Sequence, residues 1–156
     1  MSLAGVAMYS KPMLAGWGDM DFNAHMKNTA FLDKSADLRM LFFAEHGFAM
    51  AEFRRLQIGP VVMKDELEYH KEVGLLQTID VSLALAGLSD DGSRFVMCNE
   101  IRRADDGKLC ARVTSAGGWL NLAERRLVAP PPALLGALSA LPHTDDFSVL
   151  PSSLRA

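Results

Sequence analysis

The spacing of apolar residues along the chain changes near Pro60. Between Thr29 and His46 there is no glycine or proline, and apolar residues recur at helical spacing. The stripe comprises Phe31, Leu38, Leu41 and Phe42, broadened by Ala30, Met40 and Phe43. This pattern predicts a long helix that is buried on several sides and ends at Gly47. A second, short helix is predicted from Met50 to Leu56, before Gly59-Pro60.

After Pro60 the period becomes two, as expected of half-buried strands. Alternation predicts strands over residues 61–69 and 79–86, and two more over 95–103 and 109–122. The last two flank Asp105-Asp106-Gly107, which is typical of a hairpin turn. Gly117-Gly118 predicts a bulge or sharp bend in the final strand, as a curling sheet requires.

The two ends of the chain complete the predicted fold. A first strand is expected from about Ala7 to Trp17, and a short helix from Ala133 to Leu141, after three prolines. The residues beyond that helix are rich in proline and serine, and we expect them to be loosely held. We therefore expect one domain over 1–156, with a core at about 7–122 and a C-terminal helix and tail at 130–156. A single apolar helix with a sheet long enough to cover it predicts an α+β fold, a curved antiparallel sheet wrapped around the helix.

Composition and charge narrow the class of protein. The 156 residues are 49% hydrophobic with a net charge of −3, which supports a substantial core and argues against a nucleic-acid partner. No apolar run is long enough to span a membrane, and the start of the chain lacks a signal-peptide pattern, so we expect a cytoplasmic protein. Cys98 and Cys110 fall too far apart across the predicted hairpin for a disulfide, and neither has the spacing of a metal site. We therefore expect free thiols and no metal.

Polar residues gather just before the long helix, in the segment Trp17-Gly-Asp-Met-Asp-Phe-Asn-Ala-His-Met-Lys-Asn28. Carboxylate and imidazole groups beside a helix N-terminus can activate water, while the free N–H groups stabilise an oxyanion. Each residue also has a structural reading: Asp21 or Asn28 could cap the helix, and Asp19 could bind backbone in the turn. His25 could orient the carboxylate or water, or merely hold the loop.

The segment Trp17-Gly-Asp-Met-Asp-x-x-x-His-x-x-Asn28, followed by a long helix, resembles the hotdog-fold acyl-CoA thioesterases of the 4-hydroxybenzoyl-CoA thioesterase type. Their pattern is roughly R-W-x-D-x-D-x-x-G-H-x-N-N-x-x-Y. The chain departs from that pattern at four positions, Gly16, Ala24, Lys27 and Phe31.

The resemblance implies the hotdog fold and roles for individual residues. Asp21 stands where the family has its nucleophile or general base, supported by His25 and Asn28, with Asp19 in a supporting position. Backbone N–H groups at the start of the helix would receive the thioester oxygen. Coenzyme A, as part of the substrate, would lie along a subunit interface, and no further cofactor is implied.

Substrate contacts are expected from several further residues. Asp65 falls on the otherwise apolar face of its strand, so it either joins a site shared across a dimer or is turned outward by a bulge. Phe31 and Met63, with Trp119, could line an acyl pocket. Arg102 and Arg103, near the Asp-Gly turn, are candidates to bind the phosphates of coenzyme A, as are Lys108, Arg125 and Arg126.

The sequence therefore predicts an acyl-CoA thioesterase that hydrolyses its substrate to a free acid and CoA. Open sheet edges favour a homodimer or homotetramer with the active site at the interface. A non-catalytic acyl-thioester-binding protein is the main alternative. An enoyl-thioester hydratase of the same fold is less favoured, because those enzymes carry their Asp/His pair on a different element.

Overall fold

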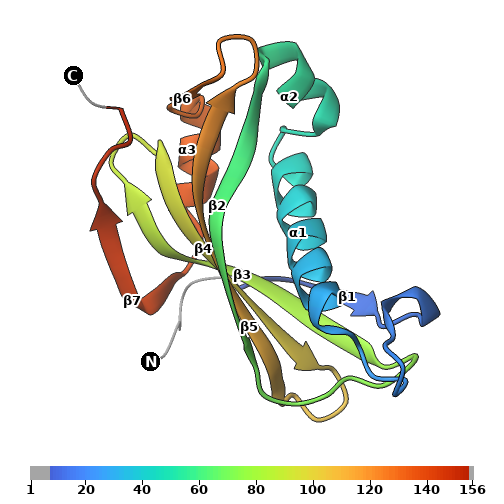
Figure 1. Cartoon of the computed structure of the whole chain (residues 1–156). Coiled ribbons are helices and arrows are strands. Elements are labelled where there is room, and N and C mark those ends of the chain that lie inside the picture. Colours follow the sequence, from blue (N-terminus) through green and yellow to red (C-terminus); the bar gives the residue numbers. More distant parts are fainter. Residues whose placement is uncertain (1–7, 155–156) are drawn as a thin grey trace.

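A long helix, α1 (Asn28–Glu45), lies across the inner face of a curved sheet in the computed structural model, which describes residues 8–154 (Figure 1). The helix begins and ends within one residue of the limits that the sequence predicts. Its buried side chains include Leu38, Phe42 and Phe43, whereas Leu41 and Met40 of the predicted stripe are each 42% exposed. Burial of apolar side chains against the sheet is therefore the main force that stabilises α1.

The sheet has the order β1-β3-β4-β5-β2, and every neighbouring pair in this path is antiparallel. The strands are β1 (Tyr9–Leu14), β2 (Ile58–Tyr69), β3 (Thr78–Ser89), β4 (Arg94–Arg103) and β5 (Leu109–Asn121). The predicted start of the first strand at Ala7 lies outside the described residues. All four strands predicted after Pro60 are confirmed, and β2 forms an open edge. This is the α+β arrangement of the hotdog fold, with the sheet curved around α1.

The core fills the space between α1 and the inner face of the sheet. The alternating residues of β3, Ile79, Val81, Leu83 and Leu85, are fully buried. An aromatic cluster closes the far end, where the Trp119 ring lies 5.6 Å from that of Phe43 and stacks on Phe53 at 6.2 Å. Such ring pairs add to the stability from buried area.

Short elements link the helix to the sheet. Gly47 follows α1 with φ of +90°, a left-handed conformation that favours glycine, as its predicted role at the helix end requires. Helix α2 (Met50–Leu56) has the predicted bounds. The chain then enters β2 through Gln57, which also has a positive φ.

The bulge predicted at Gly117-Gly118 occurs in the neighbouring strand. β5 keeps a regular register with β4 through both glycines, while β2 bulges between Val62 and Lys64, opposite Gly117. A Cβ atom on Gly117 would overlap the carbonyl oxygen of Val61. The glycine therefore allows the close backbone approach that the bulge in its partner strand imposes.

The cysteine prediction is confirmed. Cys98 and Cys110 are free thiols, and Cys98 pairs with Thr114 across the β4–β5 hairpin, four residues along β5 from Cys110. Burial raises the pKa of the Cys98 thiol to about 11.

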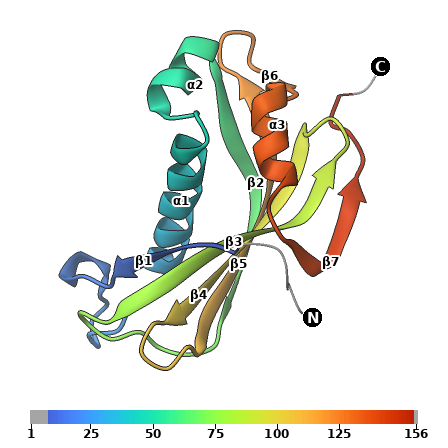
Figure 2. The same ribbon diagram turned by 180° about the vertical axis from the view of Figure 1, so that it is seen from behind.

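The C-terminal segment is more ordered than the sequence suggests. Helix α3 (Pro132–Ser139) lies on the side of the sheet away from α1, and β7 (His143–Leu150) pairs in parallel with β3 (Figure 2). A short strand, β6 (Arg126–Val128), pairs with β5. Beyond β7, Ser152 donates a hydrogen bond to Asp91 in the β3–β4 turn. The expectation of a loosely held tail is therefore wrong for the residues described.

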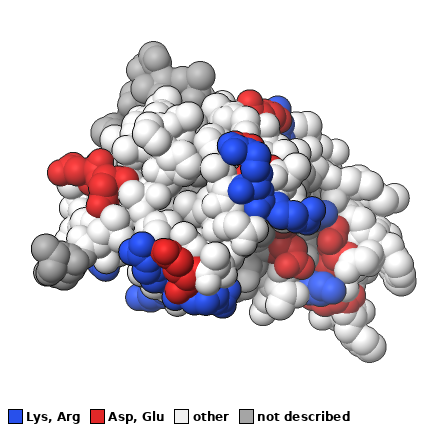
Figure 3. All heavy atoms as spheres, turned by 90° about the horizontal axis from the view of Figure 1, so that it is seen from above, with Lys and Arg blue, Asp and Glu red and all other residues white. Residues whose placement is uncertain are grey.

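None of the helices in residues 8–154 is long and apolar enough to cross a bilayer. Charges of both signs lie close together on the face shown in Figure 3. Exposed ion pairs include Arg55–Glu52 at 2.7 Å and Arg126–Glu124 at 2.7 Å. Such pairs are weak surface interactions.

Candidate active site

The segment between β1 and α1 folds into a small hairpin that returns the chain to the helix. A 3-10 turn, η1 (Trp17–Asp19), is followed by an antiparallel bridge between Met20 and Met26. The Asp21 N–H donates to the His25 carbonyl at 2.7 Å. Buried Met26 anchors the hairpin by donating its N–H to the Val73 carbonyl at 2.7 Å. The hairpin thus places Asp21 opposite His25, three residues before the start of α1.

Asp19 has the structural role that its position suggested. Its Oδ2 accepts the Gly16 N–H at 2.9 Å and lies 3.0 Å from the Lys34 Nζ on α1. Burial would raise the pKa of this carboxyl, but the Gly16 bond and the Lys34 ammonium together lower it. The sequence reasoning missed Lys34, whose position two turns into the helix is the signal that it could reach back to the loop. Asp19 therefore ties the loop to the helix.

Asp21 presents an exposed carboxylate at the tip of the hairpin. Its Oδ1 accepts the Asn23 N–H at 2.8 Å and the His25 N–H at 3.2 Å. These two bonds hold the carboxylate in place within its own loop, and neither bond involves α1. The Asp21 carboxylate is therefore held in one orientation and does not cap α1.

The hairpin also explains a departure from the family pattern. Ala24 has a φ of 59°, in the left-handed region. Glycine adopts this region readily and asparagine and aspartate sometimes do, whereas other residues rarely adopt it. The related pattern has glycine at this position. The chain therefore keeps the loop conformation that glycine favours while carrying a residue that strains it.

His25 holds the hairpin through its backbone and pairs its ring with Glu72. Its backbone bridges Gly74, and its Nε2 lies 3.4 Å from a Glu72 carboxylate oxygen. The loop-holding reading is thus supported by its backbone bonds. Within a single chain, the ring is partnered by Glu72, a residue that the sequence reasoning missed.

The N-terminus of α1 has no side-chain cap. Lys27 occupies the N-cap position, and Asn28 is the first helical residue. Neither the Asn28 nor the Thr29 N–H finds an acceptor among residues 8–154, so two donors remain free at the positive end of the helix dipole. Tyr69, at the end of β2, donates its hydroxyl to the Asn28 carbonyl at 3.2 Å. The capping reading of Asp21 and Asn28 is not what the structure shows.

The predicted substrate residues fall in different places. Phe31 is buried, with its ring 5.6 Å from that of Tyr69, whereas Met63 is 64% exposed at the β2 bulge. Asp65 stays on the α1 side of β2, where it accepts the Ser115 hydroxyl at 2.5 Å. The bulge does not turn Asp65 to the outer face.

The two arginines of β4 separate onto opposite faces of the sheet. Arg103 donates to the Glu72 carbonyl at 3.3 Å and pairs with Asp106 at 2.8 Å, which places it near the segment that contacts His25. Arg102 lies on the outer face, paired with Glu100 at 3.1 Å. Adjacent strand residues point to opposite sides, so the pair cannot share one phosphate site.

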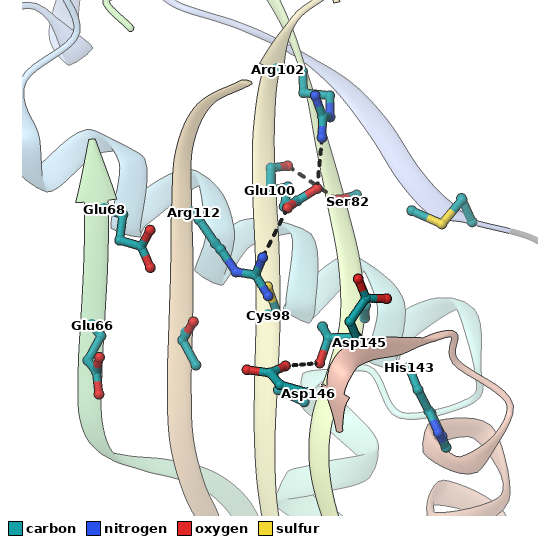
Figure 4. Close-up of a pocket in the computed structure, with 15 residues that line it drawn as sticks. Glu66, Glu68, Ser82, Cys98, Glu100, Arg102, Arg112, His143, Asp145 and Asp146 are labelled. Carbon is teal, nitrogen blue, oxygen red and sulfur yellow. Dashed lines mark hydrogen bonds and ion pairs between the residues drawn. The ribbon is translucent and has the colours of Figure 1, made fainter. Parts of the chain in front are cut away.

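Arg102 lines a cavity of about 730 Å³ on the outer face, between the sheet and β7 (Figure 4). Arg112 and Arg102 both point toward Glu100 there, and Glu66 and Glu68 line the opposite wall. Of the predicted site residues, only Arg102 belongs to this cavity. The outer cavity and the hairpin of Asp21 are thus two separate sites.

The fold and the hairpin together define a class: a hotdog domain with an exposed carboxylate in the loop that leads into the uncapped N-terminus of its central helix. A family model described as the thioesterase-like superfamily matches residues 15–138. The chain belongs to that superfamily. Among curated proteins, none matches the sequence significantly.

Solved structures show the same fold at low sequence identity. A Staphylococcus aureus protein solved in complex with CoA is 19% identical, with a TM-score of 0.78, over 88% of this chain and 86% of that one. A 1,4-dihydroxy-2-naphthoyl-CoA thioesterase from Synechocystis is 14% identical, with a TM-score of 0.76, over 85% and 96%. A gentisyl-coenzyme A thioesterase is 15% identical, with a TM-score of 0.73, over 83% and 99%.

Proposed function

We propose that this protein is an acyl-CoA thioesterase in which Asp21 acts on the thioester carbonyl. The observation that carries the proposal is the hairpin, which orients the Asp21 carboxylate in the loop just before α1, a helix that starts with two free N–H groups. Thioester hydrolysis needs this pair of features, a base or nucleophile and donors where negative charge develops. Membership of the thioesterase-like superfamily supports the same reaction.

In the general-base form of the reaction, Asp21 takes a proton from water as the water oxygen attacks the carbonyl carbon. The Asn28 and Thr29 N–H groups would bind the oxyanion of the tetrahedral intermediate. The C–S bond then breaks, the carbonyl re-forms, and the proton held by Asp21 passes to the departing thiolate. In the nucleophilic form, an Asp21 carboxylate oxygen attacks the carbonyl carbon, the C–S bond breaks and the CoA thiolate leaves, and water then hydrolyses the resulting anhydride to the free acid and the Asp21 carboxylate.

The proposal includes a homodimer or homotetramer with its active site at the subunit interface. The open edge strand β2 supports this, because it leaves Val62 and Met63 exposed at 44% and 64%. The S. aureus relative was solved with CoA, and the same ligand is proposed here. Arg103 is the better placed of the two predicted phosphate-binding arginines, since it lies on the side of Glu72 and His25.

A non-catalytic acyl-thioester binder is the second candidate. The observation that favours it is the His25 ring, which contacts Glu72 and leaves Asp21 without an imidazole partner in the single chain. A binder would retain affinity for acyl-CoA and release no thiol.

The test is free-thiol release from a panel of aliphatic and aromatic acyl-CoAs, combined with calorimetric binding of CoA. We expect release from at least one acyl class. Binding of acyl-CoA without release across the panel would establish the binder, and hydration of an enoyl-CoA without release would establish a hydratase.

A further inference from the structure

Arg39 is a buried cation whose Nη1 has no hydrogen-bond partner among residues 8–154. The side chain lies in the middle of α1, is 6% exposed, and its Nη1 finds no acceptor. Of the arginines within residues 8–154, this is the one classed as buried. A buried guanidinium is costly unless its donors are satisfied, so the structure must provide a reason for this one.

Among residues 8–154, the Asp65 carboxylate is the charge that raises the pKa of Arg39. Burial lowers the pKa of Arg39 and the nearby Asp65 carboxylate opposes that shift. Ser115 donates its hydroxyl to Asp65, and no hydrogen bond joins Asp65 to Arg39 among the described residues. Arg39 and Asp65 therefore carry opposite charges, while Arg39 keeps a free donor and the Asp65 carboxylate can accept further hydrogen bonds from a ligand.

Helical spacing aligns Arg39 with the proposed reaction centre. Asn28, Ser35 and Arg39 stand at positions i, i+7 and i+11, which places them on one face of α1. Strand β2 reaches the helix at two points: the Tyr69 hydroxyl donates to the Asn28 backbone carbonyl at one end, and the Asp65 carboxylate interacts with Arg39 further along. Figure 1 shows α1 and β2 running beside each other. Arg39 lies about 16 Å along the helix axis from Asn28, and its side chain leans back toward the N-terminus.

A second unsatisfied group lies on the facing surface of the sheet. The Asn99 side chain is fully buried, donates to the Ser82 carbonyl at 3.0 Å, and leaves its Oδ1 without a partner. On β4 and β5, Asn99 and Ser115 share the inner face, because Arg112 and Thr114 line the outer cavity. Polar groups with spare hydrogen-bonding capacity thus occur on both the helix and the sheet in this region.

We infer that Arg39 and Asp65 recognise a hydroxyl group on the acyl chain, at a distance from the thioester, and so select hydroxylated aliphatic acyl groups. This inference rests on the proposed thioesterase function. A hydroxyl can accept a hydrogen bond from Arg39 and donate one to Asp65, which suits a pair whose charges already balance. A terminal carboxylate would face the Asp65 carboxylate, and a terminal methyl would leave the guanidinium unsatisfied. A site built to bind a hydroxyl discriminates strongly against a substrate that lacks one.

The test compares medium-chain acyl-CoAs of equal length that end in a methyl, a hydroxyl or a carboxylate group. For the wild type we expect kcat/KM for the hydroxyl-ended chain to exceed the other two by about tenfold or more at the best chain length. Arg39→Met, which keeps much of the side-chain volume, should abolish this preference by lowering kcat/KM for the hydroxyl-ended chain far more than for the methyl-ended chain. Arg54→Met, at an exposed arginine of α2, is the matched control and should keep the wild-type preference.

Three results would overturn the inference: equal kcat/KM for the three chains in the wild type, a preference for the carboxylate, or an equal loss on every substrate in Arg39→Met. If Arg39→Met does not fold, Asp65→Asn decides, and an unchanged hydroxyl preference in that variant overturns the inference. If no thioester is cleaved, the proposed function fails, and thioether analogues of the three acyl-CoAs test the recognition alone by calorimetry. Tighter binding of the hydroxyl-ended thioether by the wild type, but not by Arg39→Met, supports the role of Arg39, and equal binding refutes it.

Discussion

The two faces of the sheet differ in how they satisfy polar groups. The outer face carries paired charges around a large cavity, with Glu100 bound by both Arg102 and Arg112. The inner face is apolar, and its few polar groups leave donors free, at Arg39 and at the start of α1. The outer cavity of about 730 Å³ therefore lies on the side where the polar groups already have hydrogen-bond or ion-pair partners. Unsatisfied donors, more than cavity volume, indicate where a substrate would bind.

The largest expected effect on folding comes from the tight inner face. Gly117→Ala places a methyl group against the Val61 carbonyl opposite the β2 bulge. We expect a loss of about 3 kcal/mol or more in the free energy of unfolding, measured by urea denaturation. Gly136→Ala in α3 is the control, because a Cβ there meets nothing within 4 Å and should stabilise the protein by up to about 1 kcal/mol. Equal stability of both variants would show that the close approach at the bulge does not constrain the sheet.

A smaller loss is expected where the inner face ends at the loop. Asp19→Asn removes the charge that binds Lys34 and weakens the acceptor for the Gly16 N–H. We expect the free energy of unfolding at pH 7 to fall by about 1 kcal/mol, since both partners are partly screened by solvent. The Lys34→Met variant should lose a similar amount, and the double variant should lose less than the sum. Fully additive losses would mean that the two side chains do not act as a pair.

Acid should weaken the tie between the β3–β4 turn and the C-terminal segment. The hydroxyls of Ser152, Ser93 and Ser89 donate to Asp91 and, against the effect of burial, hold the pKa of its carboxyl below the usual range. A carboxyl with a lowered folded-state pKa stabilises the fold above its unfolded pKa of about 3.9, and this contribution is lost as the pH falls further. Wild type should therefore have a higher Tm than Asp91→Asn above about pH 4, with the difference shrinking below it. A constant difference between pH 7 and pH 2 would contradict the assigned role.

The smallest effects are expected on the outer face. Arg112→Gln removes one of two partners of Glu100 at a partly exposed position, with an Nη1–Oε2 distance of 3.4 Å. We expect a loss of no more than about 1 kcal/mol and an unchanged rate of thiol release. A large drop in kcat would indicate that the reaction takes place in the outer cavity and not on the inner face of the sheet.

The sequence predicted those parts of the fold that depend on local pattern. The bounds of α1 and α2, the alternation of β3 and the Asp-Gly hairpin all follow from residues close together in the chain. β7 escaped prediction because it pairs only at one edge and stays largely exposed, so its residues show no regular alternation. The bulge was assigned to the wrong strand because glycine marks a close approach and does not identify which of the two strands deforms.

The candidate site was predictable in its loop and less so beyond it. The residue pattern gave Asp19 and Asp21, and strand parity could have separated Arg102 from Arg103, since Arg102 alternates with Cys98 and Glu100. The contact of His25 with Glu72 required the fold, because 47 positions along the chain separate these residues. Arg39 could have been noticed from its spacing with Asn28 and Ser35, but its burial and missing partner could not.

The central claim is that the two carboxylates of the loop have different roles, Asp19 in structure and Asp21 in chemistry. The most direct test is kcat for thiol release by Asp21→Asn at saturating acyl-CoA, alongside its Tm. We expect kcat to fall by about a hundredfold or more, with a Tm within a few degrees of wild type because the Asp21 side chain is exposed and binds only its own loop. A folded Asp21→Asn variant that keeps the wild-type kcat would contradict the account.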